Sequence, residues 1–130
     1  MFETLCDLLE RRVSGLVAIY AFGSRVRGEA RRDSDFDLAV LATSPLDPQL
    51  RWQLQQELAV AAGAEVDLVD LRRASTVMRT QVLKDARVLF DGNRPARELF
   101  EATALSAYAR LNEERRGILA DIAARGTVYG

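Results

Sequence analysis

Two short stretches of this sequence carry side chains whose types and spacing favour phosphate and metal chemistry. Gly23 and Ser24 follow an apolar run, and Asp35 and Asp37 come after a gap of ten residues. A glycine lets backbone amides approach a phosphate, and the neighbouring serine hydroxyl adds a hydrogen-bonding group. On a strand, Asp35 and Asp37 point to the same face because side chains alternate. A third carboxylate, Asp67, lies on a later predicted strand.

Three carboxylates that converge on one place need a cation. At about 4 Å, each pair repels by roughly 4 kcal/mol at an effective dielectric constant of 20. Magnesium suits such a cluster because it takes few carboxylates and keeps room for phosphates and water. Two magnesium ions can clamp the attacking and leaving oxygens of an in-line displacement. We therefore predict that Asp35, Asp37 and Asp67 are catalytic and bind two Mg²⁺ ions, with Asp67 on the second ion and a candidate general base.

The third carboxylate has a competitor, because Asp70 lies three residues after Asp67. Alternation along the strand puts Asp70 on the opposite face, so Asp67 is preferred.

Composition limits the other kinds of chemistry. The chain has 130 residues, the length of one domain, with 48% hydrophobic and 28% charged residues. There is no histidine and only one cysteine, Cys6, which excludes His-based zinc sites, catalytic triads and an internal disulfide. Cys6 is expected to be a small buried hydrophobe. The net charge of −1 gives no global attraction to nucleic acid, so no direct nucleic-acid binding is expected.

Neither a signal peptide nor a membrane span is expected. The N-terminus lacks a basic and then apolar layout, and no apolar run approaches the roughly 20 residues that a bilayer requires. A cytoplasmic protein is predicted.

Hydrophobic periodicity predicts alternating helices and strands that must position these residues. Helices are expected at 2–13, 50–62, 76–85 and 95–125, strands at 16–22, 35–41, 65–71 and 88–90, and a short helix within 23–33. This order predicts an α+β (α/β-like) fold with a small mixed sheet flanked by helices. Residues 1–130 are expected to form one domain, with a catalytic core at 1–92 and a C-terminal helix at 94–125. Tyr20 and Phe22 are expected in the core, and Trp52 is expected to pack.

The C-terminal helix is long for so small a domain. Its apolar positions are Leu99, Phe100, Leu105, Tyr108, Leu111, Ile118 and Ile122. This helix either packs across its own sheet or contacts a partner, as a homodimer or a hetero-oligomer; partner contact is the favoured alternative.

The run at 23–38, Gly-Ser-Arg-Val-Arg-Gly-Glu-Ala-Arg-Arg-Asp-Ser-Asp-Phe-Asp-Leu, resembles the signature of the DNA polymerase beta-like nucleotidyltransferase superfamily. Element order and length extend the resemblance to about residue 92, and the short chain is similar to the minimal nucleotidyltransferase (MNT) antitoxins that accompany HEPN-domain ribonuclease toxins. The resemblance implies a nucleotidyltransferase fold in which Gly23, Ser24 and Arg27 bind the nucleoside triphosphate. Val26 stands where alanine is commoner, which leaves the catalytic groups intact.

The other arginines of this run have no assigned role. Guanidinium groups fork onto phosphate oxygens, but Arg25, Arg31 and Arg32 could equally be solvated or face an acidic partner.

The activity implied by the resemblance is transfer of AMP from ATP to a hydroxyl of the cognate HEPN toxin, a tyrosine being the favoured acceptor, which silences the toxin. Two alternatives stay open. The protein could neutralise its partner chiefly by non-catalytic occlusion, or it could modify a small molecule such as an aminoglycoside. The second alternative usually needs a further substrate-binding domain, and little chain is left to build one.

Overall fold

The computed structural model describes residues 1–29 and 35–124. Its elements in chain order are α1 (Phe2–Arg12), β1 (Leu16–Phe22), α2 (Ser24–Arg27), β2 (Phe36–Ala42), α3 (Pro48–Ala62), β3 (Val66–Asp70), α4 (Thr76–Asp85), β4 (Arg87–Asp91) and α5 (Arg94–Ala124). The strands form one sheet in the order β3-β2-β1-β4. The β2–β3 pair is parallel and the other two pairs are antiparallel. The predicted α+β architecture with a small mixed sheet is confirmed.

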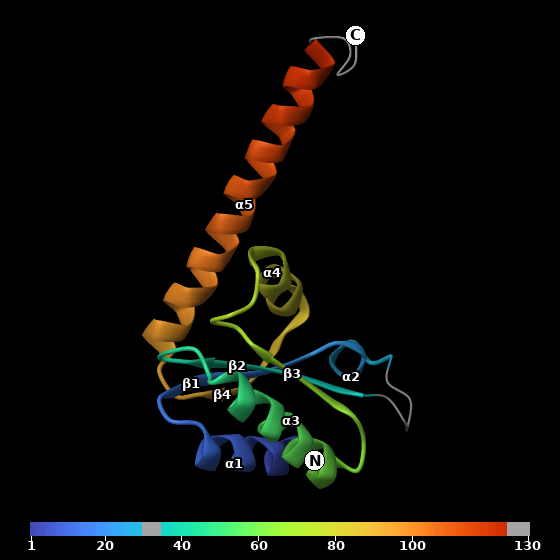
Figure 1. The fold of residues 1–130 in the computed structure, drawn as a ribbon, viewed down its shortest axis with the longest axis vertical. Helices are drawn as coiled ribbons and strands as arrows, with labels where there is room; N and C mark the ends of the chain where they lie inside the picture. The colour runs from blue at the N-terminus through green and yellow to red at the C-terminus, as the bar shows by residue number, and fades with distance from the viewer. Residues whose placement is uncertain (30–34, 125–130) are drawn as a thin grey trace.

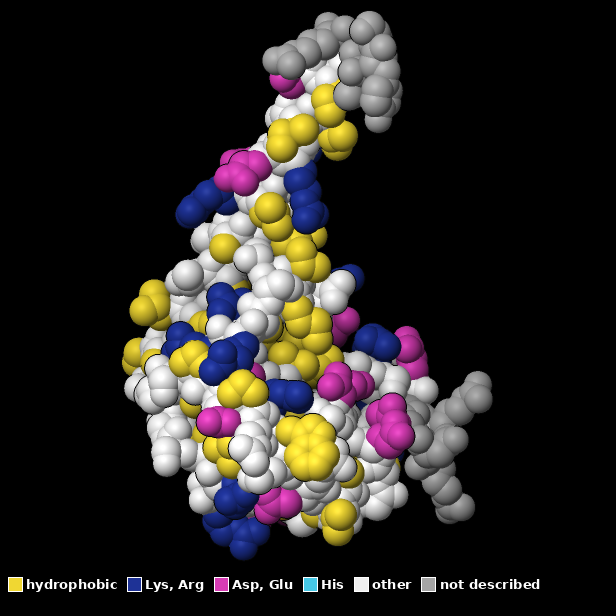
Figure 2. Space-filling view, viewed as in Figure 1, with side chains coloured by type: hydrophobic (Ala, Val, Ile, Leu, Met, Phe, Trp, Pro, Cys, Tyr) yellow, Lys and Arg dark blue, Asp and Glu magenta, His cyan; other side chains and the backbone are white. Residues whose placement is uncertain are grey.

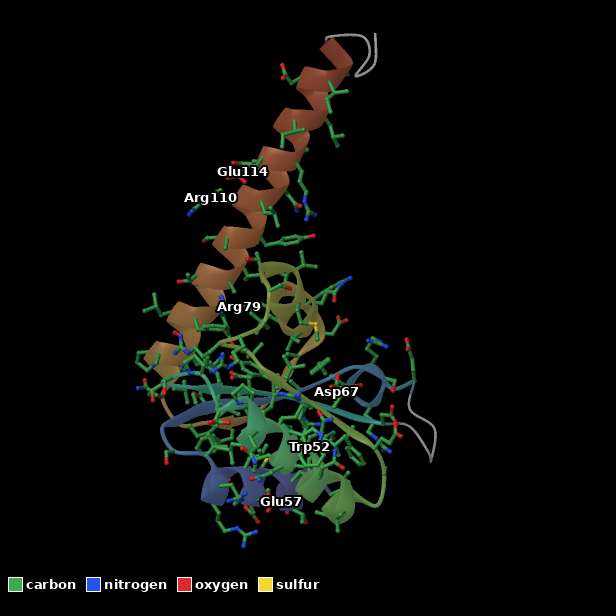
Figure 3. All side chains as sticks on the ribbon, viewed as in Figure 1. Trp52, Glu57, Asp67, Arg79, Arg110 and Glu114 are labelled. Carbon is green, nitrogen blue, oxygen red and sulfur yellow. The ribbon has the colours of Figure 1, made fainter. Side chains whose placement is uncertain are left out.

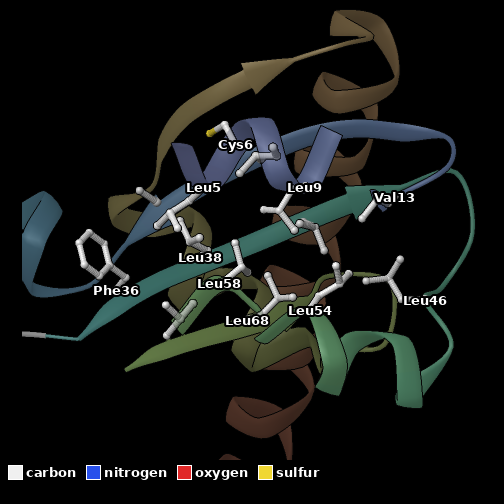
Figure 4. Packing of buried hydrophobic residues seen from close by; sticks show 14 of the residues in the cluster. Leu5, Cys6, Leu9, Val13, Phe36, Leu38, Leu46, Leu54, Leu58 and Leu68 are labelled. Carbon is white, nitrogen blue, oxygen red and sulfur yellow. The ribbon is translucent and has the colours of Figure 1, made fainter. Parts of the chain in front are cut away.

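The sheet separates two layers of helices, with α1 and α3 on one face and α4 and α5 on the other (Figure 1). Side chains alternate along β2, so this strand contributes apolar residues to the cores on both faces of the sheet. Phe36, Leu38 and Val40 join the core beneath α1 and α3, which Figure 4 shows, whereas Ala39 and Leu41 join the core beneath α4 and α5. Because both faces are covered, the central strands are apolar almost throughout. A polar residue on such a strand is therefore conspicuous.

Local capping explains where α3 begins and ends. The Asp47 side chain accepts a hydrogen bond from the Gln49 amide, and Pro48 occupies the first turn. Gly63 adopts the left-handed conformation that closes the helix. The helix thus starts two residues before the predicted boundary at 50, because apolar spacing does not reveal a start that depends on a side-chain cap.

The first half of α5 is anchored to the sheet by a polar contact and by packing. The Tyr20 hydroxyl on β1 donates to Glu101 Oε1 at 2.8 Å, and Arg97 donates to the same oxygen at 2.8 Å. Phe100 is buried among residues of β1 and β2, and Ala104 is buried one turn later. Burial and the bond to Glu101 raise the pKa of Tyr20, so this phenol stays protonated and keeps donating. The start of α5 is therefore fixed relative to β1.

The second half of α5 extends away from the sheet (Figure 1). Ile118, Leu119 and Ile122 are exposed there, and hydrophobic side chains follow this half of the helix in Figure 2. The predicted apolar stripe thus exceeds what the core covers. No helix within 1–29 and 35–124 combines the length and apolar character needed to cross a bilayer.

The outer edge of β3 is closed by side chains from α3. The Leu68 amide donates to Gln55 Oε1 at 3.0 Å, and Arg51 Nη1 donates to the Leu68 carbonyl at 3.0 Å. Arg51 Nη1 also donates to Gln55 Oε1 at 3.2 Å, which joins the two contacts. An edge strand otherwise offers its free amides and carbonyls to other chains. This cap holds β3 as the last strand of the sheet.

Replacing Gln55 by alanine should destabilise the protein. Gln55→Ala leaves the Leu68 amide without its side-chain acceptor, so we expect the free energy of unfolding to fall by about 1–3 kcal/mol. Urea denaturation followed by circular dichroism measures the change. Gln53→Ala on the exposed side of the same helix is the control and should change stability by less than about 0.5 kcal/mol. Equal stabilities for the two variants would contradict the role given to Gln55.

Candidate active site

Strand pairing brings the predicted site residues to one end of the sheet. In the antiparallel β1–β2 pair, Phe22 lies opposite Asp37, and Gly23 follows directly. In the parallel β2–β3 pair, Asp37 lies opposite Asp67. Asp35 comes just before β2 and is exposed. Figure 3 shows Asp67 at the end of the sheet that carries α2. Residues 44 positions apart in sequence therefore become neighbours.

Gly23 is required at its position for two separate reasons. Its φ is 80° and its ψ is −160°, a combination that side chains other than hydrogen rarely allow. A Cβ at this position would also overlap the Asp37 carboxylate and lie 2.9 Å from Asp37 Cγ. The turn after β1 therefore passes directly over the carboxylate on β2. Only a glycine lets the backbone of the predicted phosphate-binding turn approach this carboxylate so closely.

The single turn α2 divides the residues after Gly23 between two sides. Successive helical residues are about 100° apart, so Ser24 and Arg27 share one side while Arg25 and Val26 share the other. Val26 packs against the core beneath α1 and α3. The Ser24 and Arg27 side is therefore the one available to a ligand.

Arg27 lies near the carboxylates. Its positive charge lowers the pKa of Asp37, opposing the other groups around that residue. Arg27 Nε also forms an ion pair with Glu29 Oε2 at 3.3 Å, and the Arg27 side chain is 43% exposed. Arg27 thus acts electrostatically on Asp37 while its side chain stays partly exposed to solvent.

Arg25 points elsewhere. Its guanidinium carbon lies 3.8 Å from the centroid of the Phe36 ring, which faces α1 and α3. Sequence analysis assigned no role to Arg25 or to Phe36. Their contact could be suspected only from their positions in the motif, because Arg25 follows Ser24 and Phe36 lies between Asp35 and Asp37.

The surroundings of Asp37 disfavour its ionised form. Its pKa is raised from 3.8, first by burial and then by the negative charges of Asp67 and Asp35. Like charges and desolvation both disfavour the ionised form. A cation between these groups would remove that penalty, and oxygen ligands of this kind suit magnesium. The donor set therefore fits Mg²⁺.

The carboxylates do not form a closed metal cage by themselves. Within the part of the chain that the structure describes, no group of three or more acidic or cysteine side chains is close enough to hold an ion. Asp37 and Asp67 are paired in register, and Asp35 stands at the exposed margin. Magnesium in such sites keeps several ligands from substrate phosphates and water, so an open donor set is what a triphosphate site needs.

Asp70, the competitor of Asp67, has a structural role. Asp70 is buried, its Oδ2 accepts from the Leu46 amide at 2.8 Å, and its Oδ1 accepts from the Arg72 amide at 3.0 Å. These bonds tie the loops after β2 and β3 together. Asp67 is exposed on the other face of the strand, beside Asp37, so the preference for Asp67 over Asp70 agrees with the geometry.

The prediction that Trp52 packs against the rest of the domain is wrong. Trp52 is 57% exposed, and Figure 3 shows it on the outside of α3. The helix buries Leu54 and Leu58, and a residue two positions before Leu54 lies about 200° around the helix axis. Trp52 therefore belongs to the solvent-facing side of α3.

The remaining core predictions hold. Tyr20 is buried on β1, and Phe22 is partly buried against the core beneath α4 and α5. Cys6 is buried in α1, where burial, followed by Glu10 and Asp7, raises the pKa of its thiol to about 11. This thiol is inert at neutral pH.

Arg31 and Arg32 lie outside the described residues.

Comparison with known proteins agrees with this geometry. Residues 3–95 match the family model "Polymerase beta, Nucleotidyltransferase". The chain is 44% identical over 120 residues to protein adenylyltransferase MntA of Shewanella oneidensis, covering 92% of this chain and 86% of that protein.

Two solved structures extend the comparison to three dimensions. A chain in a crystal structure of a toxin–antitoxin with AMP-PNP has 42% identity and a TM-score of 0.83, covering 93% of this chain and 97% of that one. A chain in the complex of tri-AMPylated Shewanella oneidensis HEPN toxin with MNT antitoxin has 40% identity and a TM-score of 0.77, covering 93% and 94%. The sequence match, the shared fold and the arrangement around Gly23, Asp37 and Asp67 agree, and this chain belongs to the polymerase beta nucleotidyltransferase family.

Proposed function

We propose that this chain is an antitoxin that transfers AMP from ATP to a hydroxyl of a cognate HEPN toxin and so neutralises it, with a tyrosine as the acceptor. The observation that carries the proposal is the 44% identity, along 92% of the chain, to a protein adenylyltransferase. The relatives in solved structures agree with it, because one is in a complex with AMP-PNP and another is bound to an AMPylated HEPN toxin.

The site has a group for each part of the reaction. Gly23, Ser24 and Arg27 would bind the triphosphate, with the turn at Gly23 bringing the backbone close to Asp37. The acceptor oxygen attacks the α-phosphorus, the bond from that phosphorus to the bridging oxygen breaks, and pyrophosphate leaves. Asp67, on the exposed edge of the site, is the candidate that takes the hydroxyl proton.

Two magnesium ions are part of the proposal, held by Asp35, Asp37 and Asp67. Magnesium supplies charge neutralisation for the phosphates and lowers the pKa of the incoming hydroxyl. The raised pKa of Asp37 supports this assignment, because its causes, burial and then the negative charges of Asp67 and Asp35, disfavour an ionised form that bound cations would stabilise.

The long helix α5 gives the partner a surface. We assign catalysis to residues 1–92 and partner contact to the helix at 94–125, whose second half leaves apolar side chains exposed. The reaction consumes ATP, which agrees with action in the cytoplasm.

Transfer of label from ATP to the toxin tests the proposal. The full chain, Mg²⁺, ATP labelled at the α-phosphate and the cognate HEPN toxin together should give labelled toxin, and Asp35→Asn/Asp37→Asn should give none. Asp85→Asn, the same type of substitution at an exposed residue of α4, is the control and should label normally. Omitting Mg²⁺ should stop the reaction.

The alternatives give different results in the same experiment. If Asp35→Asn/Asp37→Asn still protected cells fully from the toxin, occlusion rather than transfer would be the mechanism. If an aminoglycoside acquired label and the toxin never did, the small-molecule reaction would replace the proposal.

A further inference from the structure

A contact between Arg25 and Phe36 connects the two ends of the active-site motif, Gly23–Ser24 and Asp35–Asp37. The guanidinium carbon of Arg25 lies 3.8 Å from the centroid of the Phe36 ring, within the range of a cation–π contact. Arg25 directly follows Ser24, and Phe36 lies between Asp35 and Asp37. The contact therefore connects the phosphate-binding turn to the strand that bears the carboxylates.

Phe36 also packs against a second aromatic ring. Its ring packs edge-to-face on Phe2, with centroids 5.5 Å apart and an interplanar angle of 89°. Phe36 is only 6% exposed and belongs to the core beneath α1 and α3, where Figure 4 shows it beside Leu5 and Leu38. A ring fixed in this way gives Arg25 an immobile surface on which to stack.

The contact between Arg25 and Phe36 lies on the face of the sheet opposite to the Asp37 carboxylate. Phe36 and Asp37 are consecutive on β2, so their side chains point to opposite faces. In the same way, Arg25 lies on the side of α2 away from Ser24 and Arg27. Arg25 is thus directed to the ring of Phe36, whereas Ser24 and Arg27 lie on the other side of α2.

We propose that Arg25 is a positioning residue whose stacking on Phe36 fixes the distance between the phosphate-binding turn and the metal-binding carboxylates. The inference rests on the proposed function. The phosphate-binding turn is only one helical turn long. It must stay close to Asp37, and only a glycine at position 23 allows this close approach. Catalysis by positioning is sensitive to small shifts, since a misplacement of about 1 Å costs on the order of 10²-fold in rate.

The test is a double-mutant cycle on transfer to the cognate HEPN toxin. Arg25→Met keeps the length of the side chain and removes its charge, and Phe36→Leu keeps an apolar core residue and removes the ring. Each single variant should lower kcat by on the order of tenfold, with a smaller change in KM for ATP. The double variant should be no slower than the slower single variant, because both remove the same contact. Arg25→Lys should restore much of the rate.

A matched control separates this role from general stability. Arg12 on α1 pairs with Glu57 on α3 at 2.9 Å, so it also joins two elements on this face of the sheet but lies away from the motif. Arg12→Met should transfer AMP at the wild-type rate. The melting temperature of Arg25→Met should stay within about 4 °C of the wild type.

Several outcomes would overturn the inference. Wild-type kcat for Arg25→Met would do so, as would losses that multiply independently in the double variant. A large rise in KM for Arg25→Met with no effect of Phe36→Leu would make Arg25 a phosphate ligand instead. Failure of the wild-type protein to label the toxin is a separate result, which would overturn the proposed function.

Discussion

Asp37→Asn is expected to abolish AMP transfer while making the metal-free protein more stable. The first effect follows from the position of Asp37, beside Asp67 and beneath the turn at Gly23, where the proposed function has its carboxylate bind a magnesium ion. Losing about 4 kcal/mol of transition-state stabilisation lowers the rate by about 10³-fold. Label transfer to the toxin measures this loss.

The gain in stability follows from the raised pKa of Asp37. Between the ordinary carboxyl pKa of 3.8 and the higher value in the folded protein, the native state binds more protons than the unfolded state. The contribution of Asp37 to the free energy of unfolding therefore falls as the pH rises through that window, and it stays unfavourable above it. An asparagine has the same shape without the charge, so it removes the penalty.

Thermal unfolding in EDTA at several pH values measures this effect. At pH 7 the variant should melt at a higher temperature than the wild type, and the difference should disappear at a pH below the ordinary carboxyl pKa. Adding Mg²⁺ and ATP should raise the melting temperature of the wild type and leave that of Asp37→Asn nearly unchanged. A metal-free variant that is less stable than the wild type at pH 7 would contradict the electrostatic account.

Gly23→Ala should damage both folding and activity. The backbone of Gly23 lies in a region that costs roughly 1–3 kcal/mol for a residue with a side chain. In addition, the new methyl group would overlap the Asp37 carboxylate, so the turn or the carboxylate must move. We expect label transfer to fall by on the order of 10²-fold, because the phosphate-binding turn and the carboxylate can no longer lie together.

Gly63→Ala separates the two effects of the Gly23 substitution. Gly63 also has a positive φ, 65°, but a Cβ there would meet nothing within 4 Å, and the residue closes α3. Gly63→Ala should therefore lower the melting temperature and leave the kcat for transfer unchanged. If Gly23→Ala retained wild-type kcat, the close approach to Asp37 would have no role in the reaction.

Local pattern was sufficient for most of the elements. The helix at 76–85 and the strand at 16–22 have the predicted bounds, because apolar periodicity and flanking residues define both. The predicted helix at 50–62 missed its first two residues, since the Asp47 cap acts through a side-chain hydrogen bond. Trp52 was misplaced because a stripe at 54 and 58 determines which side of α3 faces inward, and an isolated aromatic residue does not.

The residue types of the site can be predicted from the sequence alone, since Gly23, Ser24, Asp35 and Asp37 are close along the chain and their spacing is a local property. The position of Asp67 opposite Asp37 requires the three-dimensional structure, because the register of two parallel strands depends on packing between distant segments.

The structure also shows which group Arg25 contacts. The positive charge of its neighbour Arg27 acts on Asp37, whereas Arg25 stacks on Phe36 on the opposite face of the sheet. Two arginines two positions apart are alike in sequence. The turn of α2 and the alternation along β2 give them different surroundings, and these depend on how the turn and the strand pack in three dimensions.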